Sequence, residues 1–323
     1  MTANQPKLTS VSYVMPVLNE EKHLARAVES IFKQEQTGET DVVIAVGPSS
    51  DRTQEIADEL AKRFPVKVVA NPTGKTPSGL NAAIAAAKHD VVVRVDAHSE
   101  LSPGYTKLAV EVLNETGADN VGGVMKAVGE TPIQQAVAWA YMSRLGLGGG
   151  TFHVGGKAGP SDSVYLGVFR RTALERTGGF DERMIRGQDW ELNLRIRESG
   201  GVVWFDPRLE VTYHPRSKLG RLAKQFFDTG IWRATLTKMS PGRANLRYFA
   251  PPVLVASSIL GLVLWAATGW TIGVLPAAAY SFAVVTAALT AKNLNVKARL
   301  GLLVVLPTMH YCWGTGFIRG LVK

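Results

Sequence analysis

Residues 91–98 read VVVRVDAH, a run of β-branched side chains that ends in a carboxylate and an imidazole. Such a run predicts a strand buried on both faces, as in the parallel sheets of α/β proteins. Asp96 and His98 come directly after it, at the end of the strand where open α/β sheets bind their ligands. A divalent cation held there would neutralise a diphosphate. The alternative is ordinary turn chemistry, in which Asp96 only caps the following segment.

Strand and helix patterns alternate before this segment. Apolar runs predict three strands, at residues 11–17, 42–46 and 66–70. The pattern of the first strand ends near Pro16. Each strand is followed by apolar side chains at helical spacing, at residues 24–31, 56–64 and 80–87. This alternation implies parallel crossovers and a doubly wound α/β sheet.

Residues 71–79 are predicted to form a loop rich in Pro and Gly. Within it, Gly74-Lys75-Thr76 is similar to the end of a P-loop, but Val69 stands where that motif needs its first glycine. We therefore exclude a P-loop.

Glycine is dense between residues 122 and 187, which predicts long loops that form either a lid over a substrate or a flexible surface. Residues 187–193, GQDWELN, then begin an amphipathic helix that ends at Gly200-Gly201. Asp189 lies at its amino end, where it serves either as a reactive carboxylate or as a first-turn acid that stabilises the helix dipole. A short strand at residues 202–205 follows.

The charge distribution favours a membrane partner over nucleic acid. The net charge is +9, yet all 27 acidic residues precede residue 249, and the acid-free remainder is strongly apolar. No basic stripe of the kind that binds single strands is found. The single cysteine, Cys312, excludes an intramolecular disulfide and a cysteine metal cluster. Residues 1–6 are polar and lack the apolar core of a signal peptide, which predicts a cytoplasmic first domain.

The second part of the chain reads as a membrane anchor. Residues 218–247 combine basic and aromatic side chains, which predicts interfacial helices or, alternatively, a helix packed on the catalytic domain. Residues 251–291 carry no charge and are long enough for two spans of about 20 residues each, with a turn at Thr268-Gly269-Trp270. A third apolar stretch, residues 300–318, contains Pro307 and His310 and is the weakest candidate span.

Basic residues between the second and third stretches, at positions 292, 297 and 299, satisfy the positive-inside rule if the first domain is cytoplasmic. We therefore predict a multi-pass protein of the cytoplasmic membrane. Its expected parts are a catalytic domain at residues 1–215, basic interfacial helices at 216–248 and a transmembrane region at 249–323.

Five short motifs, in this order and spacing, resemble those of family 2 glycosyltransferases with the GT-A fold. They are PVLNE at 16–20, SSD at 49–51, DAH at 96–98, GGFDE at 178–182 and QDWE at 188–191. The resemblance covers about residues 11–235 and is strongest to bacterial enzymes of the succinoglycan glucosyltransferase type. It implies a doubly wound mixed sheet with helices on both faces, followed by membrane helices.

The resemblance also assigns roles to individual residues. Pro16, Asn19 and Glu20 would line the base and ribose of the donor. Asp51 is what remains of the uracil-binding motif, since Val46 and Gly47 stand where the family usually has another Asp. This departure weakens the expectation of a UDP-sugar donor.

The reaction centre follows from the same comparison. Asp96 and His98 would hold Mg²⁺ or Mn²⁺ on the donor diphosphate, with His214 completing the metal site. A nitrogen ligand shifts the preference toward Mn²⁺. Asp189 matches the catalytic base.

Four further contacts are expected from side-chain chemistry. Lys75 and Arg94 are candidates for phosphate contacts, although a solvated role is the alternative for both. Trp190 would supply an aromatic wall for a sugar, and Glu191 would orient its hydroxyls.

We expect an inverting, metal-dependent transferase that moves a hexose from a nucleotide-sugar to a lipid-linked glycan acceptor for envelope or extracellular polysaccharide. The alternatives are a polyprenyl-phosphate or glycolipid glycosyltransferase and a non-catalytic membrane-anchored binding protein. A homo-oligomer stays open.

Overall fold

The computed structural model describes residues 7–35, 37–239 and 245–322. Residues 1–6, used above against a signal peptide, and residues 240–244 of the predicted basic stretch lie outside the described residues. The chain forms two compact units. We call them the sheet unit, residues 7–126 and 151–213, and the helical unit, residues 127–150 and 214–322. The sequence-based division at residue 215 thus differs from the structure in where residues 127–150 belong.

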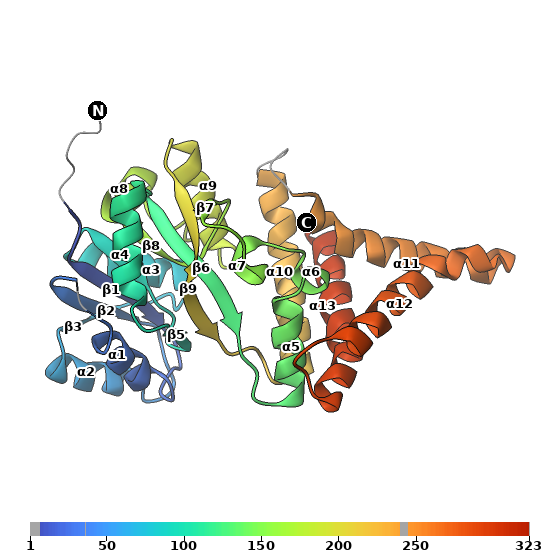
Figure 1. Ribbon diagram of the computed structural model, residues 1–323, viewed down its shortest axis with the longest axis horizontal. Helices are drawn as coiled ribbons and strands as arrows, with labels where there is room; N and C mark the ends of the chain where they lie inside the picture. Colours follow the sequence, from blue (N-terminus) through green and yellow to red (C-terminus); the bar gives the residue numbers. More distant parts are fainter. Residues whose placement is uncertain (1–6, 36, 240–244, 323) are drawn as a thin grey trace. The chain divides into compact units, whose positions relative to one another are not determined.

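One mixed sheet organises the sheet unit (Figure 1), with strand order β3-β2-β1-β4-β8-β6-β9-β5 and β7 paired with β9. Parallel pairing joins the first four strands: β1 (Val11–Val17), β2 (Thr40–Val46), β3 (Val66–Ala70) and β4 (Val91–Arg94). Antiparallel pairing extends the sheet through β8 (Tyr165–Arg170), which joins β4 to β6 (Asn120–Ala127). Strand β9 (Val203–Tyr213) pairs antiparallel with β5 (Ser99–Leu101) and β7 (Gly159–Pro160).

Helices cover both faces of this sheet, because side chains along each strand alternate between two cores. In β1, Val11, Tyr13 and Met15 join one core and Val14 the other. The first core is closed by α1 (Leu24–Phe32), α2 (Thr53–Arg63) and α4 (Tyr105–Thr116). The second is closed by α3 (Thr76–Ala86), α8 (Arg171–Thr177) and α9 (Gln188–Glu198). The predicted mixed α/β sheet with helices on both faces is confirmed.

The glycine-dense middle of the chain is ordered, so the prediction of long loops there was wrong. It contains β6, α5 (Pro132–Tyr141), α6 (Arg144–Leu147), α7 (Thr151–Val154), β7, β8 and α8. Several of its glycines permit close backbone approach: a Cβ built on Gly123 would lie 1.8 Å from the carbonyl oxygen of Leu209. A Cβ on Gly146 would lie 1.7 Å from the carbonyl oxygen of Ala140. Glycine serves packing at these positions.

Strand β1 spans the predicted residues 11–17 and includes Pro16, at a point where β4 no longer pairs with it, so the missing N–H is tolerated. Two other predicted boundaries shift. Helix α3 begins at Thr76, inside the predicted loop. Strand β9 runs to Tyr213 instead of ending near residue 205.

The helical unit contains α5, α6, α10 (Leu219–Met239), α11 (Ala250–Thr268), α12 (Leu275–Thr290) and α13 (Val296–Val322). Short 3₁₀ turns, η1 (Leu246–Phe249) and η2 (Thr271–Val274), precede α11 and α12. Three segments are long and apolar enough to cross a membrane: Leu246–Thr268, Thr271–Thr290 and Val296–Val322. The apolar stretches and the turn at Gly269-Trp270 lie where the sequence predicts them.

Candidate active site

The carboxyl ends of the four parallel strands meet at one edge of the sheet. The loop after β1 is tied to the loop after β2: Asn19 N donates to Ser49 Oγ at 3.0 Å, and Ser50 N donates to Asn19 Oδ1 at 2.8 Å. Asn19 has φ +57, a left-handed conformation that Asn tolerates better than most residues. Glu20 N donates to Thr53 Oγ1 at 2.8 Å. The structure therefore brings Asn19 and Glu20 together with the β2–α2 loop.

Asp51 supports this arrangement through its own hydrogen bonds. Its carboxylate accepts from the backbone N–H of Thr53 at 3.0 Å, from the Thr53 hydroxyl at 2.5 Å and from Glu21 N at 3.2 Å. The Thr53 hydroxyl is the main reason that the pKa of Asp51 lies below its usual range. Asp51 therefore fixes the two loops, and a contact with the donor base stays a prediction.

Lys75 lies at the same edge, in the loop after β3. It is exposed and directly precedes α3, and its carbonyl oxygen accepts from Asn71 Nδ2 at 3.0 Å. Gly74, at φ +64, lies against the ring of Pro48 in the β2–α2 loop. A phosphate contact by Lys75 stays a prediction.

The loop after β4 carries the central cluster of charges. Arg94, the last residue of β4, places one guanidinium nitrogen against Asp189 Oδ1 and another 3.2 Å from Asp96 Oδ1. Its side chain is 5% exposed, against 21% for Asp96 and 38% for Asp189. A buried cation thus joins two partly exposed carboxylates that the sequence assigns to metal binding and to base catalysis.

The electrostatics of this cluster follow from its composition. Burial lowers the pKa of the Arg94 guanidinium, but the charges of Asp189 and Asp96 outweigh burial and raise that pKa above its usual value. Arg94 therefore remains a cation throughout the working range of an enzyme. Its contacts are with the two acids, and a phosphate contact stays a prediction.

Asp189 is held in place by the start of α9. The helix begins after Gly187, which has φ +76, and Asp189 lies in its first turn, where the helix dipole favours a carboxylate. Asn193 anchors the next turn: its Oδ1 accepts from Asn120 Nδ2 at 2.6 Å, and its Nδ2 donates to Ser163 Oγ at 3.0 Å. This buried network fixes α9 against the sheet.

Glu191 has a structural partner. Both of its carboxylate oxygens accept from Arg195 at 2.6 Å, and Arg195 Nη2 also donates to the carbonyl oxygen of Gly179 at 2.8 Å. Asn81 holds the same turn, since Phe180 N donates to its Oδ1 at 2.8 Å. Glu191 therefore anchors the GGFDE segment, and a contact with the acceptor stays a prediction. Trp190 lies beside Asp189 in the first turn and is half-buried.

His98 lies close to the β1 loop. Its Nδ1 is 3.5 Å from Glu20 Oε1, and its ring centroid is 6.4 Å from that of Tyr213. The sequence did not predict this proximity of Glu20, expected at the nucleotide, to His98, expected at the metal. His214 follows Tyr213 but belongs to the helical unit, and its part in metal binding stays a prediction.

The side chains around Asp96 suit a cation shared with a substrate. Within the part of the chain that the structure describes, no group of three or more His, Cys, Asp or Glu is arranged to hold a metal. Mg²⁺ at nucleotide sites usually takes one or two carboxylates and completes its shell with phosphate oxygens and water. Asp96 can supply the carboxylate of such a site, and a nitrogen ligand from His98 would shift its preference toward Mn²⁺.

Tyr165 is a member of the cluster that the sequence did not reveal. It comes from β8, and its ring centroid is 6.4 Å from that of Tyr213. Burial, and then the charge of Asp96, raise the pKa of its hydroxyl above the usual range. A single aromatic residue in a glycine-dense segment carries no local signal of this position.

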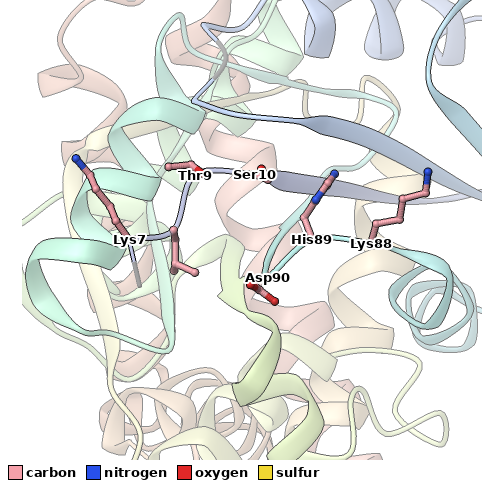
Figure 2. Close-up of a pocket in the computed structure, with 7 residues that line it drawn as sticks. Lys7, Thr9, Ser10, Lys88, His89 and Asp90 are labelled. Atoms are coloured by element: carbon pink, nitrogen blue, oxygen red, sulfur yellow. The ribbon is translucent and has the colours of Figure 1, made fainter. Parts of the chain in front are cut away.

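A hollow elsewhere in the sheet unit has different surroundings (Figure 2). It is lined by residues 7–10, which precede β1, and 88–90, which precede β4, so it lies at the amino ends of these strands. Here Ser12 Oγ donates to Asp41 at 2.5 Å and accepts from the N–H of His89 at 3.0 Å. These bonds close the turn before β4, at the end of the strands opposite Asp96.

The model of the family described as "Glycosyl transferase family 2" matches residues 12–178, about half of the chain. The chain belongs to this family. This family 2 glycosyltransferase is 31% identical over 328 residues to the succinoglycan biosynthesis protein ExoA of Rhizobium meliloti (strain 1021). The match covers 100% of this chain and 98% of the relative. The resemblance inferred from the five motifs is confirmed.

A second relative comes from Methanococcus voltae. It is a dolichyl N-acetyl-alpha-D-glucosaminyl phosphate 3-beta-D-2,3-diacetamido-2,3-dideoxy-beta-D-glucuronosyltransferase, 24% identical, with 97% of each chain covered. This family 2 glycosyltransferase thus has homologues in polysaccharide synthesis and in lipid-linked glycan synthesis.

Solved structures share its fold. The mannosyltransferase PcManGT from Pyrobaculum calidifontis, in complex with GDP-Man and Mn²⁺, matches with a TM-score of 0.60 and 20% identity over 96% of this chain and 86% of that one. S. aureus TarS 1–349 matches with a TM-score of 0.51 and 15% identity, covering 96% and 90%. The family 2 glycosyltransferase therefore has the predicted GT-A-like fold.

Proposed function

We propose that the chain transfers a hexose, with inversion, from a nucleoside-diphosphate sugar to a lipid-linked glycan acceptor at the cytoplasmic face of the membrane. One observation carries this proposal. Arg94 holds Asp96 and Asp189 at the carboxyl edge of the parallel strands, in a chain of glycosyl transferase family 2. Two carboxylates, to which we assign different tasks, thereby contact one guanidinium.

Asp189 is the proposed base. A sugar hydroxyl is a poor nucleophile at neutral pH, so a carboxylate within hydrogen-bond reach accepts its proton as the new C–O bond forms. The bond between the anomeric carbon and the diphosphate oxygen breaks in the same displacement. A single displacement inverts the anomeric centre.

Asp96 and His98 are the proposed protein ligands of a divalent cation, Mn²⁺ or Mg²⁺. Bound there, the cation would neutralise negative charge on the leaving diphosphate. Pro16 at the end of β1, and Asn19 and Glu20 in the loop after it, are the proposed contacts of the nucleoside. Lys75, in the loop after β3, is the proposed contact of the phosphates.

Arg94 is a positioning residue in this scheme. Its fixed, planar guanidinium can donate to two carboxylates at once, which an ammonium group cannot match in geometry. It orients Asp189 toward the acceptor and offsets the repulsion between Asp189 and Asp96.

The acceptor class is inferred from the apolar helices and the relatives. A substrate whose lipid remains in the bilayer suits an enzyme anchored by such helices, and one relative is named for a dolichyl-phosphate-linked acceptor. Direct transfer to polyprenyl phosphate is the second candidate, favoured by the basic residues of the 218–247 stretch.

The test incubates purified protein with membrane lipid extract, Mn²⁺ and a panel of radiolabelled nucleotide-sugars. We expect label from one donor to enter the lipid fraction. The change Asp189→Asn should lower turnover by about 10²–10⁴-fold with donor affinity retained. Asp58→Asn, an exposed change of the same type on α2, is the control and should leave turnover unaltered. Normal transfer by Asp189→Asn would contradict the assignment of the base.

A further inference from the structure

The α11–α12 hairpin has a far end that no other part of the described helical unit covers. Every side chain at residues 262–272 is exposed, and most are apolar, including Trp265 at 48% and Trp270 at 66%. The backbone of α11 contacts that of η2, directly before α12, since a Cβ on Gly261 would lie 1.9 Å from the carbonyl oxygen of Gly273. Within the helical unit, Figure 1 shows the arms converging at a tip away from α13. Lipid is the environment that such a surface fits.

Helix α13 has a different environment. Of its most apolar window, 56% is buried by protein, against 28% for the α11 segment and 22% for the α12 segment. Helix α5 covers its first half, where a Cβ added to Gly301 would lie 3.1 Å from the Ala136 side chain. Helix α10 covers its second half, around Gly316 and Gly320. His310, midway along α13, is buried and hydrogen-bonds through Nε2 to the carbonyl oxygen of Gly146 at 3.0 Å.

Glycines join α10 and α13 backbone to backbone. A Cβ on Gly230 would lie 2.2 Å from the carbonyl oxygen of Trp313, and one on Gly316 would lie 2.1 Å from that of Phe227. A Cβ on Gly320 would lie 2.7 Å from the carbonyl oxygen of Ile231. Because the two backbones are in contact, α10 must lie at the same depth in a bilayer as the second half of α13.

Helix α10 is too polar for the hydrocarbon core. Lys224 and Asp228 form an ion pair at 2.8 Å in which the lysine side chain is 77% exposed, and Arg221 is exposed one turn earlier. Ionised side chains facing lipid at the centre of a bilayer are strongly disfavoured. If α13 crossed the membrane, α10 would carry these charged side chains toward the centre of the bilayer.

Four of the five basic residues of the acid-free segment agree with this limit. Lys292, Lys297 and Arg299 lie between α12 and the first turn of α13, and Arg319 lies near the end of α13. Residues 268–272, at the tip of the hairpin, carry no charge. With two spans all four basic residues lie on one side, whereas a third span would move Arg319 across.

We propose that α11 and α12 cross the bilayer as a hairpin, and that α13 does not cross but lies with α10 in the interface on the side of the sheet unit. Only residues 214–218 connect β9 to α10, so no span separates the sheet unit from this helix pair. The basic side chains of the pair face anionic head groups. The inference needs the bilayer of the proposed function but neither its donor nor its base.

The test uses single cysteines in a Cys312→Ala background and a membrane-impermeant maleimide. Trp270→Cys reports the tip, Lys292→Cys the return, and Val322→Cys and Leu321→Cys the end of α13; all four positions are exposed. In spheroplasts with the outer face accessible, only Trp270→Cys should react. In inverted vesicles Lys292→Cys, Val322→Cys and Leu321→Cys should react and Trp270→Cys should not.

Reaction of Val322→Cys or Leu321→Cys from the side opposite to that of Lys22→Cys would overturn the proposal, as would failure of Trp270→Cys to react from that opposite side. Lys22→Cys, exposed on the sheet unit, separates this outcome from the proposed function. Reaction of Lys22→Cys from outside would contradict the cytoplasmic active site. The number of spans would still be decided by whether the tip and the end of α13 react from the same side as Lys22→Cys or from the opposite side. Using two positions at the end of α13 keeps the result decisive if one variant does not accumulate.

Discussion

Arg94 at the end of β4 and Asp189 in the first turn of α9 form an ion pair, although 95 positions separate them in the sequence. The same guanidinium lies 3.2 Å from Asp96. The orientation of the proposed base is therefore coupled to that of the proposed metal ligand. A substrate that draws Asp96 toward a cation would change the balance of charge around Arg94 and Asp189.

The change Arg94→Lys tests this coupling. Lysine keeps the charge but loses the planar fork, so one of the two carboxylates loses its partner. We expect kcat to fall by about 10²-fold, the scale on which small misplacements of reacting groups act. Steady-state kinetics with saturating donor measures the effect.

A double-mutant cycle decides whether Arg94 acts through Asp189. The pair Arg94→Lys with Asp189→Asn should lose little more than Asp189→Asn alone, because groups that act as a unit are not additive. Arg183→Lys is the matched control, since Arg183 binds Asp181 at the surface with 84% of its side chain exposed. Full additivity of the two losses would show that Arg94 has a separate role.

Removal of the metal ligand should act on donor binding. In Asp96→Ala the diphosphate loses the carboxylate that fixes a cation beside it, so the donor should bind more weakly and its affinity should no longer depend on Mn²⁺. Calorimetric titration of the donor, with Mn²⁺ and with EDTA, measures both effects. Equal donor affinity of the unaltered protein in Mn²⁺ and in EDTA would refute a metal site at Asp96.

Glu191 should matter for stability more than for binding the acceptor. The Glu191→Ala change leaves Arg195 without its carboxylate in a pair whose side chains are only 11% and 28% exposed. We expect a loss of about 1–3 kcal/mol in the free energy of unfolding, the usual cost of unpairing a largely buried polar group.

Thermal unfolding in detergent provides the measurement for Glu191→Ala. Glu55→Ala removes an exposed partner of Arg52 and should leave the unfolding midpoint unchanged, because exposed ion pairs contribute little. A raised KM for the acceptor in Glu191→Ala, at unchanged stability, would instead favour a direct contact with the sugar.

The local sequence pattern predicted most of the sheet, because its strands are short apolar runs separated by turn-forming residues. Residues 91–98 identified β4 and the edge where Asp96 lies, since a β-branched run that ends in polar residues has few other readings. Pairings across long sequence distance were not predicted. No feature of the sequence around Arg94 indicates that Asp189 is its partner, and none around Glu20 indicates that His98 lies close to it.

Glycine was misread for a related reason. A glycine that gives a chain freedom and a glycine that makes room for a neighbour look the same in one sequence. In β6 the neighbour of Gly123 is the backbone of β9, some 80 residues later, and only the sheet shows it.

The change Gly123→Ala tests that explanation. The added Cβ would lie 1.8 Å from the carbonyl oxygen of Leu209 and 2.6 Å from that of Asp206, so backbone must move in β6 or β9. Overpacking of this kind typically costs about 1–3 kcal/mol, and we expect a lower unfolding midpoint of that order. Gly159→Ala, in β7, is the matched control, because no atom lies within 4 Å of its added Cβ. If both variants unfold at the same temperature, close packing is not the reason for glycine at position 123.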